Sequence, residues 1–230
     1  MLDEVASTQD VLQGSNLTSG DVCVAELQNK GRGRLDREFI SQKYLGLTFS
    51  LIIQPNIPRD TWGIIPLLIG KTCAEVLTQI CETDIKTKWP NDLITNSEKK
   101  LGGILVELHS NKIAQAELHC GIGINVNTTL KQLPVIEATS LYLETNKEWD
   151  RNLLLVEILK KLEINLKKLE NHEELEIEKW CKTISQEVEI TPVVGAKFYG
   201  LATGISSAGE LRLADGQLIH AGIIRHLRSN

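Results

Sequence analysis

The sequence predicts an α/β (α+β) fold in which a mixed α/β domain over residues 1–186 precedes a small antiparallel β-barrel over residues 187–230. In the first part, apolar runs of strand length alternate with a long apolar helix, the pattern of a sheet covered by helices. A second, amphipathic helix follows residue 150. From residue 187 onward, glycines separate short runs, as in hairpins.

The first half of the larger domain is expected to hold a short helix, two strands and a long helix. Ser7 or Thr8 offers a capping oxygen to the first helix. Val76, Leu77 and Ile80 repeat at helical spacing in the long one. The expected boundaries are residues 7–13 for the short helix, 22–27 and 45–53 for the strands, and 67–81 for the long helix.

The second half is expected to add three strands and an amphipathic helix. Leu155, Ile158 and Leu162 belong to one apolar stripe after residue 150, with lysines and glutamates opposite. In the smaller domain, Asp215-Gly216 between apolar residues indicates a hairpin. The expected strands are residues 85–89, 100–109 and 113–126, with a turn at residues 95–98.

Composition narrows the functional class. The net charge of −5 argues against a protein that neutralises a long stretch of nucleic-acid backbone. The five cysteines form no C-x-x-C pair, so they indicate neither a zinc site nor a disulfide framework, and are expected to be reduced and buried. The N-terminus lacks the features of a signal peptide and the apolar runs look too short to cross a bilayer, so we expect a cytoplasmic protein.

A basic, glycine-containing segment follows the first predicted strand. It reads Gln-Asn-Lys-Gly-Arg-Gly-Arg-Leu-Asp-Arg over residues 28–37. Its glycines allow close approach of backbone amides to a ligand, and its arginines offer fork-shaped donors to phosphate or carboxylate. It lacks the lysine and serine of a P-loop. The segment is therefore either an anion clamp or an exposed basic turn.

The segment Lys86 to Asp92 combines lysines with a tryptophan and a proline at a predicted strand end. Lys86 and Lys88 share one face, Trp89 takes the other, and Pro90 ends the strand. Lys88 would suit a phosphate as a point charge. Taken alone, the pattern favours a surface lysine beside a core tryptophan over a phosphate-binding lysine.

Two later strands contain closely spaced glycines. Gly121, Gly123 and Asn125 point to one side of a strand, so a flat or chain-like ligand has room to lie against its backbone. Gly102 and Gly103 remove side chains from the start of another strand. A close helix crossing or a bulge would account for either pair equally well.

These motifs, in this order, resemble the catalytic domain of biotin protein ligases. The matching segments are Gln28 with Gly-Arg-Gly-Arg at 31–34, Lys-Trp-Pro-Asn-Asp at 88–92, Leu-Gly-Gly-Ile-Leu-Val-Glu at 101–107 and Gly-Ile-Gly-Ile-Asn-Val-Asn at 121–127. The resemblance implies a mixed-sheet catalytic domain of the biotin/lipoate ligase type followed by an SH3-like barrel. It also implies that biotin and Mg-ATP form biotinyl-5'-AMP, from which biotin passes to a lysine of a biotin carboxyl carrier protein.

The resemblance assigns roles to individual residues. Lys88, Arg34 and Arg32 are expected to be catalytic, with Arg32 closing over the adenylate. Biotin contacts are expected from Ser7, Thr8, Gln9, Gln28, Gly31, Arg32, Gly33, Arg34, Lys88, Gly103, Gly121 and Gly123. ATP contacts are expected from Arg34, Arg37, Phe39, Lys88, Asn91 and Asn125. The Mg2+ ligands and the base for lysine transfer are not predicted.

Three features depart from the family pattern: Gln9 replaces an asparagine, Leu35-Asp36 replaces a more basic, glycine-containing pair, and Phe39 replaces a tryptophan. Six residues precede Ser7, so the sequence predicts a monofunctional ligase that does not bind DNA, with no membrane association and with homodimerisation left open. Two alternatives are a lipoate or octanoate ligase, which shares the fold and the acyl-adenylate chemistry, and a non-catalytic biotin-sensing module.

Overall fold

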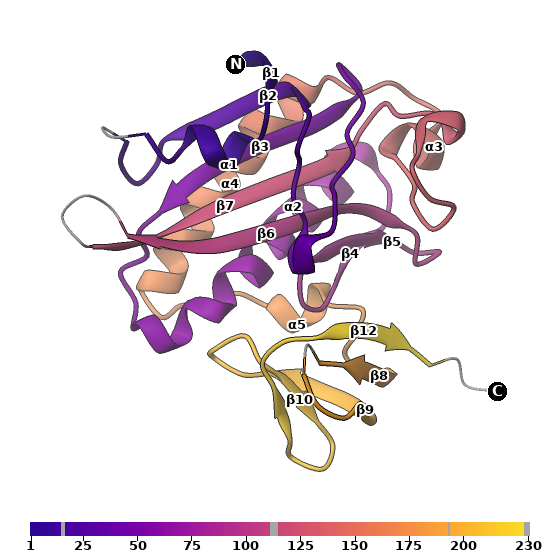
Figure 1. The fold of residues 1–230 in the computed structure, drawn as a ribbon. Coiled ribbons are helices and arrows are strands. Elements are labelled where there is room, and N and C mark those ends of the chain that lie inside the picture. The colour runs from indigo at the N-terminus through magenta and orange to yellow at the C-terminus, as the bar shows by residue number, and fades with distance from the viewer. Residues whose placement is uncertain (15–16, 111–114, 193, 228–230) are drawn as a thin grey trace.

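The computed structural model describes residues 1–14, 17–110, 115–192 and 194–227. Figure 1 shows a large sheet with the order β1-β2-β3-β7-β6-β5-β4 and a smaller, C-terminal sheet with the order β11-β10-β9-β8-β12. In the large sheet β1 and β2 pair in parallel and the other neighbours pair antiparallel, so the predicted mixed sheet is confirmed. Its strands are β1 (Leu2–Val5), β2 (Val22–Gln28), β3 (Gly46–Ile53), β4 (Ile85–Lys88), β5 (Asp92–Thr95), β6 (Lys100–Ser110) and β7 (Ala116–Asn125).

The two long helices, α2 and α4, lie on one side of the large sheet (Figure 1). Phe49, Ile104 and Ile122 point toward them from three adjacent strands and form the centre of the core. The helices are α1 (Thr8–Val11), α2 (Ile65–Cys81), α3 (Leu141–Thr145), α4 (Arg151–Glu170) and α5 (Ile177–Trp180), with 3-10 turns at Arg34–Asp36, Arg59–Ile64 and Leu130–Gln132.

Helix α2 is the central helix of the core. Pro66 stands in its first turn, where the missing N–H costs no hydrogen bond, and Glu82 ends it in the left-handed conformation. By length and composition alone, the stretch Arg59–Cys81 could cross a membrane, since an 18-residue window within it has a mean hydropathy of 1.5; this corrects the expectation that every apolar run is too short. However, 72% of that window is buried inside the protein, as expected for a core helix.

The opposite side of the large sheet carries small and polar side chains. Alternation along the strands places Thr48 and Ser50 of β3 on this side, together with Gly121 and Gly123 of β7. Gly123 lies between Gly103 and Thr48, and Gly121 lies between Leu105 and Ser50. Helix α1 and the segment 29–45 cross this side in Figure 1. The glycines thus form a shallow trough in the middle of the sheet.

Several predicted boundaries change. Strands β1 and β5 are absent from the sequence-based prediction, and β7 begins at Ala116, while the predicted start at residues 113–114 lies outside the described residues. Ser7 is the N-cap residue of α1, but its side chain makes no capping hydrogen bond. Instead, the first amide of that helix, Thr8 N–H, donates to Gln28 Oε1 at 2.8 Å.

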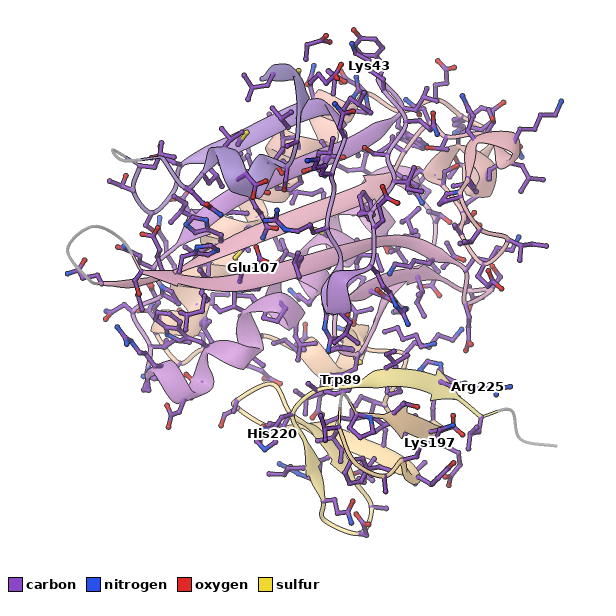
Figure 2. The ribbon with its side chains drawn as sticks, viewed as in Figure 1. Lys43, Trp89, Glu107, Lys197, His220 and Arg225 are labelled. Carbon is purple, nitrogen blue, oxygen red and sulfur yellow. The ribbon has the colours of Figure 1, made fainter. Side chains whose placement is uncertain are left out.

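The smaller sheet is attached to the larger one through Trp89. Its indole Nε1 donates to Gly209 O at 3.0 Å, and its backbone N–H donates to Thr183 Oγ1 at 3.1 Å. Figure 2 shows Trp89 at the junction of the two sheets. The C-terminal strands are β8 (Glu187–Thr191), β9 (Phe198–Ile205), β10 (Leu211–Leu213), β11 (Leu218–Ile219) and β12 (Ile223–His226). The predicted hairpin at Asp215-Gly216 is confirmed, since β10 pairs antiparallel with β11.

Candidate active site

A cavity opens over the glycine trough, between the large sheet, the arginine segment (residues 31–39) and the start of β12. It collects residues from segments that are far apart in the sequence. Twelve of the predicted site residues line it: Thr8, Gln9, Gln28, Arg32, Gly33, Arg34, Arg37, Phe39, Asn91, Gly103, Gly121 and Gly123. The four motifs found in the sequence therefore converge on one place.

One end of the cavity is polar and uncharged. Gln28 Oε1 accepts hydrogen bonds from the N–H and the hydroxyl of Thr8, at 2.8 and 3.0 Å. Thr8 Oγ1 also lies 2.6 Å from Ser50 Oγ, and both side chains are buried. This network fixes the carboxamide and the two hydroxyls in place, which is how a site presents oriented donors and acceptors to a small polar ligand. Ser50 was not singled out from the sequence, because a serine in a continuous apolar run gives no signal.

Gln9 occupies the trough over Gly121. Its Nε2 donates to His119 O at 3.0 Å and to Leu105 O at 3.3 Å, so it bridges the backbones of β6 and β7. A Cβ added at Gly121 would lie 3.1 Å from Gln9 Cδ, which is tighter than most real contacts of this kind. Gly121 therefore makes room for a side chain of the protein itself, and the expectation of a bare strand at this position is corrected.

Phe39 occupies the next position along the same strand. A Cβ added at Gly123 would overlap its ring, so the ring lies directly against the glycine. The two arms of the arginine segment come together here, with an antiparallel bridge between Arg32 and Glu38. Phe39 N–H donates to Gly31 O at 2.8 Å, and a Cβ at Gly31 would overlap Phe39 O. Gly31 thus closes this hairpin-like segment and does not itself line the cavity.

The other end of the cavity is cationic. Arg34 Nη1 donates to Asn91 Oδ1 at 3.0 Å and reaches Gly222 O at 3.5 Å. Burial lowers the pKa of the Arg34 guanidinium, while nearby Asp92 opposes that shift and Arg37 adds to it. Since an arginine remains protonated throughout the physiological range, Arg34 supplies a fixed positive charge in a partly dehydrated position.

Lys100 is a second cation at this end and was not predicted from the sequence. Its Nζ lies 2.6 Å from Asp92 Oδ1, and both groups stand over Gly103, at 3.6 and 3.7 Å from where a Cβ would be. Asp92 pairs in register with Gly103, and Gly103 pairs with Gly123. The ion pair therefore lies in line with the glycines, at the β5 end of the trough. The sequence feature that could have indicated Lys100 is the pair Lys99-Lys100, which stands just before Leu101-Gly102-Gly103.

Lys88 is not part of this cavity, which corrects its predicted position. It pairs in register with Asp92 but lies on the edge strand β4, one strand further from the trough. Its side chain lines a second depression together with Glu98, Lys182 and His226. Ser7 and Asn125 also do not line the cavity; Ser7 is buried, and Asn125 Nδ2 donates to Thr139 O at 2.9 Å.

The sequence model of the biotin/lipoate A/B protein ligase family matches residues 3–127, more than half of the chain. Among curated proteins, the chain is 31% identical over 221 residues to the bifunctional ligase/repressor BirA of Bacillus spizizenii, covering 92% of this chain and 67% of that one. It is 34% identical to BirA of Salmonella typhimurium, covering 88% of this chain and 64% of that one. The chain thus spans about two thirds of the length of these relatives.

Solved structures show the same fold over nearly the full length of the chain. A biotin protein ligase from Aquifex aeolicus in complex with biotin and ATP has a TM-score of 0.84 and 35% identity, with 98% of this chain and 97% of that chain covered. A mutant of the Aquifex protein in complex with biotin has a TM-score of 0.82 and 34% identity, covering 99% of this chain and 98% of that chain.

Proposed function

Because the chain belongs to the biotin/lipoate A/B protein ligase family, we propose that it joins biotin to a lysine of another protein at the expense of ATP. The observation that carries this proposal is the polarity of the cavity. An oriented neutral network of Thr8, Gln28 and Ser50 lies at one end, and Arg34 with Lys100 lies at the other. Biotin has the same polarity, with a neutral ureido ring at one end and a carboxylate at the other.

The neutral end is proposed to hold the ureido group. A ureido group offers one carbonyl acceptor and two N–H donors, and hydroxyls and carboxamides can satisfy both kinds. The hydrogen-bond network that fixes Thr8 and Gln28 supports this assignment, because a site that pre-orients its polar groups loses little entropy on binding. Gln9, which stands where an asparagine is usual, is proposed to border the ring from its position over Gly121.

The cationic end is proposed to hold the reacting carboxylate and the α-phosphate. Activation of biotin brings a carboxylate oxygen to phosphorus and expels pyrophosphate, so two anions must approach each other before the bond forms. Fixed positive charges offset that repulsion and stabilise the transition state. Arg34 and Lys100 have the positions for this role, and exposed Arg37 stands at the mouth for the outer phosphates.

The nucleotide is proposed to enter as Mg-ATP, with the metal carried as part of the substrate. Among the described residues, Asp92 and Glu38 are the carboxylates that line the cavity. Mg2+ on a nucleotide is usually held by one or two carboxylates plus phosphate oxygens, so these two residues would suffice. Phe39, held against Gly123 by one face of its ring, is proposed to stack its other face on the adenine, with Asn91 nearby, as the resemblance implies.

The second step is proposed to be aminolysis of the mixed anhydride. The ε-amino nitrogen of an acceptor lysine attacks the biotinyl carbonyl, the C–O bond to phosphate breaks, AMP leaves, and the ammonium proton is lost to solvent or a base. The acceptor is proposed to be a biotin carboxyl carrier protein, as the resemblance implies. The divisions 1–186 and 187–230 are proposed as the catalytic domain and an SH3-like barrel.

The rival within the same family is a lipoate or octanoate ligase. Those acids present an apolar end where biotin presents its ureido group, so the oriented polar network of Thr8, Gln28 and Ser50 would gain no hydrogen bond from the ligand. The deciding experiment measures pyrophosphate release by the purified chain with ATP and Mg2+ and with biotin, lipoate or octanoate in turn. Release driven by lipoate or octanoate alone would refute the biotin assignment. Release with no acid would refute the whole proposal.

A further inference from the structure

Arg32 is held by two carboxylates that come from opposite sides of the trough. Its Nη1 lies 2.7 Å from Asp10 Oδ1 of α1, and its Nη2 lies 3.4 Å from Glu107 Oε2 of β6. These two contacts raise the pKa of Arg32, with the hydrogen bond to Asp10 as the largest cause. Both terminal nitrogens of the Arg32 guanidinium therefore contact carboxylates of the protein. The positive charge of the cationic end comes instead from Arg34 and Lys100.

Glu107 is itself fixed in position by the strand that bears it and by its neighbours. It opposes His119 of β7 in register, and His109 Nε2 lies 3.9 Å from its Oε2. The rings of His109 and His119 stack with 4.1 Å between centroids, and His119 Nε2 lies 2.9 Å from buried Glu117 Oε1. Figure 2 shows Glu107 near the middle of the large sheet, on β6. The carboxylate that receives Arg32 therefore stands on a well-braced part of the fold.

The arginine segment is anchored to the rest of the protein by two of its arginines. Arg32 joins it to α1 and β6, and Arg34 joins it to Asn91. Within the segment, Gly33 N–H donates to Arg37 O at 2.6 Å, and Leu35 has a φ of 56°, which is the left-handed region. The segment holds Phe39 over Gly123, so its position decides whether the trough is covered.

We propose that Asp10 and Glu107 are positioning residues that act through Arg32 to hold the arginine segment, residues 31–39, as a roof over the cavity. The proposal rests on the proposed function only for its effect on biotin; the effect on the segment stands independently. Asp10 and Glu107 do not line the cavity, so their loss should open the roof and leave the cationic end intact. An apparent dissociation constant rises in proportion as the binding-competent fraction falls.

The variants Asp10→Asn and Glu107→Gln remove one charge each with little change in shape. The matched control is Glu157→Gln, which removes one charge from a surface ion pair of α4, 2.8 Å from Lys160. An ion pair between partly exposed groups shifts an equilibrium by up to about fivefold. We therefore expect each clamp variant to raise the rate of tryptic cleavage within residues 30–37 by about threefold, and the double variant by about tenfold, because cleavage follows the open population.

The kinetic arm uses pyrophosphate release driven by biotin. In the double variant the KM for biotin should rise while kcat stays within about twofold of the unchanged chain, which a general loss of folding would not produce. Arg32→Lys should restore part of the protection lost in Arg32→Ala, because an ammonium can still pair with one carboxylate. This comparison counts cleavage after Arg34 and Arg37 only, since Arg32→Ala removes a trypsin site. In the Arg32→Ala background, adding Glu107→Gln should change neither readout further, because both substitutions remove the same contact.

Cleavage rates equal to those of Glu157→Gln would overturn the clamp. Unchanged KM in the double variant, or a fall in kcat with unchanged KM, would overturn the positioning role. Failure of the unsubstituted chain to release pyrophosphate with biotin would instead count against the proposed function, and the proteolysis comparison would still decide whether the clamp exists.

Discussion

Lys100 Nζ and Asp92 Oδ1 lie 2.6 Å apart over Gly103, at the cationic end of the cavity, while Lys88 lies outside it on the neighbouring edge strand. Lys88 and Lys100 thus differ in environment, although each stands in a sequence motif that could place a lysine beside a phosphate. The one that shares a cavity with Arg34 is the better candidate for the charge that the reaction requires.

The first prediction compares these two lysines. Lys100→Ala should lower biotin-driven pyrophosphate release by about 100-fold or more, the range found when one stabilising charge is removed from a transition state. Lys88→Ala should lower it by less than about tenfold, because the side chain lines a different depression. Single-turnover release of pyrophosphate measures both. The reverse order would restore the assignment of Lys88 made from sequence.

The second prediction concerns the contact between Phe39 and Gly123. Gly123→Ala puts a methyl group where the ring lies, so it should displace Phe39 and weaken ATP binding. Phe39→Ala should bring the KM for ATP to a similar value, since it removes the same proposed stacking surface. The double variant should then be no worse than Phe39→Ala alone. Additive losses, measured as KM for ATP, would show that the two residues act separately.

The third prediction concerns pH and the attachment of the C-terminal sheet. Burial lowers the pKa of His226 below its ordinary value of about 6.5, helped by nearby Lys88 and opposed by Glu98. The folded state then binds a proton less readily than the unfolded chain, so this contribution to stability is present above about pH 6.5 and is lost as pH falls through the lower, folded pKa.

Urea unfolding at about pH 7.5 and about pH 5.5, on either side of that ordinary value, measures this loss. The free energy of unfolding of the unsubstituted chain should be smaller at the lower pH. His226→Gln should lose less between the two values, because glutamine does not titrate. The hydrogen bond between His226 Nε2 and Thr183 Oγ1, at 3.1 Å, is the contact that protonation would disturb. An equal loss in both proteins would assign the pH dependence to other groups.

The fourth prediction concerns the thiols. All five cysteines are free and buried, and burial raises the pKa of Cys73 and of Cys81 to about 12. Relative to the ordinary pKa of 9.0, this lowers the thiolate fraction at neutral pH by about a thousandfold. Alkylation by iodoacetamide at about pH 8, followed by mass spectrometry, should be slow for the native chain and reach every cysteine in urea. Rapid native labelling of Cys73 would contradict the structure.

The elements that the sequence predicts well are those with a strong local pattern. The helix at residues 65–81 and the strands β2, β3 and β6 are indicated by continuous or periodic apolar residues. Strands β1 and β5 have four residues each, too few for a period to appear, and they exist because neighbouring strands offer them hydrogen bonds. The motifs were found because they place glycines and arginines unusually close together in the sequence.

The contents of the site were harder to predict, because they depend on contacts between distant segments. The glycine strand correctly indicated a trough, but only the fold brings Gln9 and Phe39 into it from separate segments. Likewise Lys100 follows a turn and is the first residue of a strand with an irregular register, so the alternation rule does not reveal which way its side chain points. Ser50 lies hidden in an apolar run and contributes through Thr8, 42 positions away.

The attachment of Trp89 has a mechanical consequence. Its indole is bound to Gly209 of the C-terminal sheet, while the three residues after it, Pro90, Asn91 and Asp92, line the cavity, and the last two contact Arg34 and Lys100. A tilt of the small sheet therefore strains the same turn that carries the partners of both cations. A protein that binds the C-terminal sheet and tilts it would in this way shift Arg34 and Lys100 without contacting either side chain.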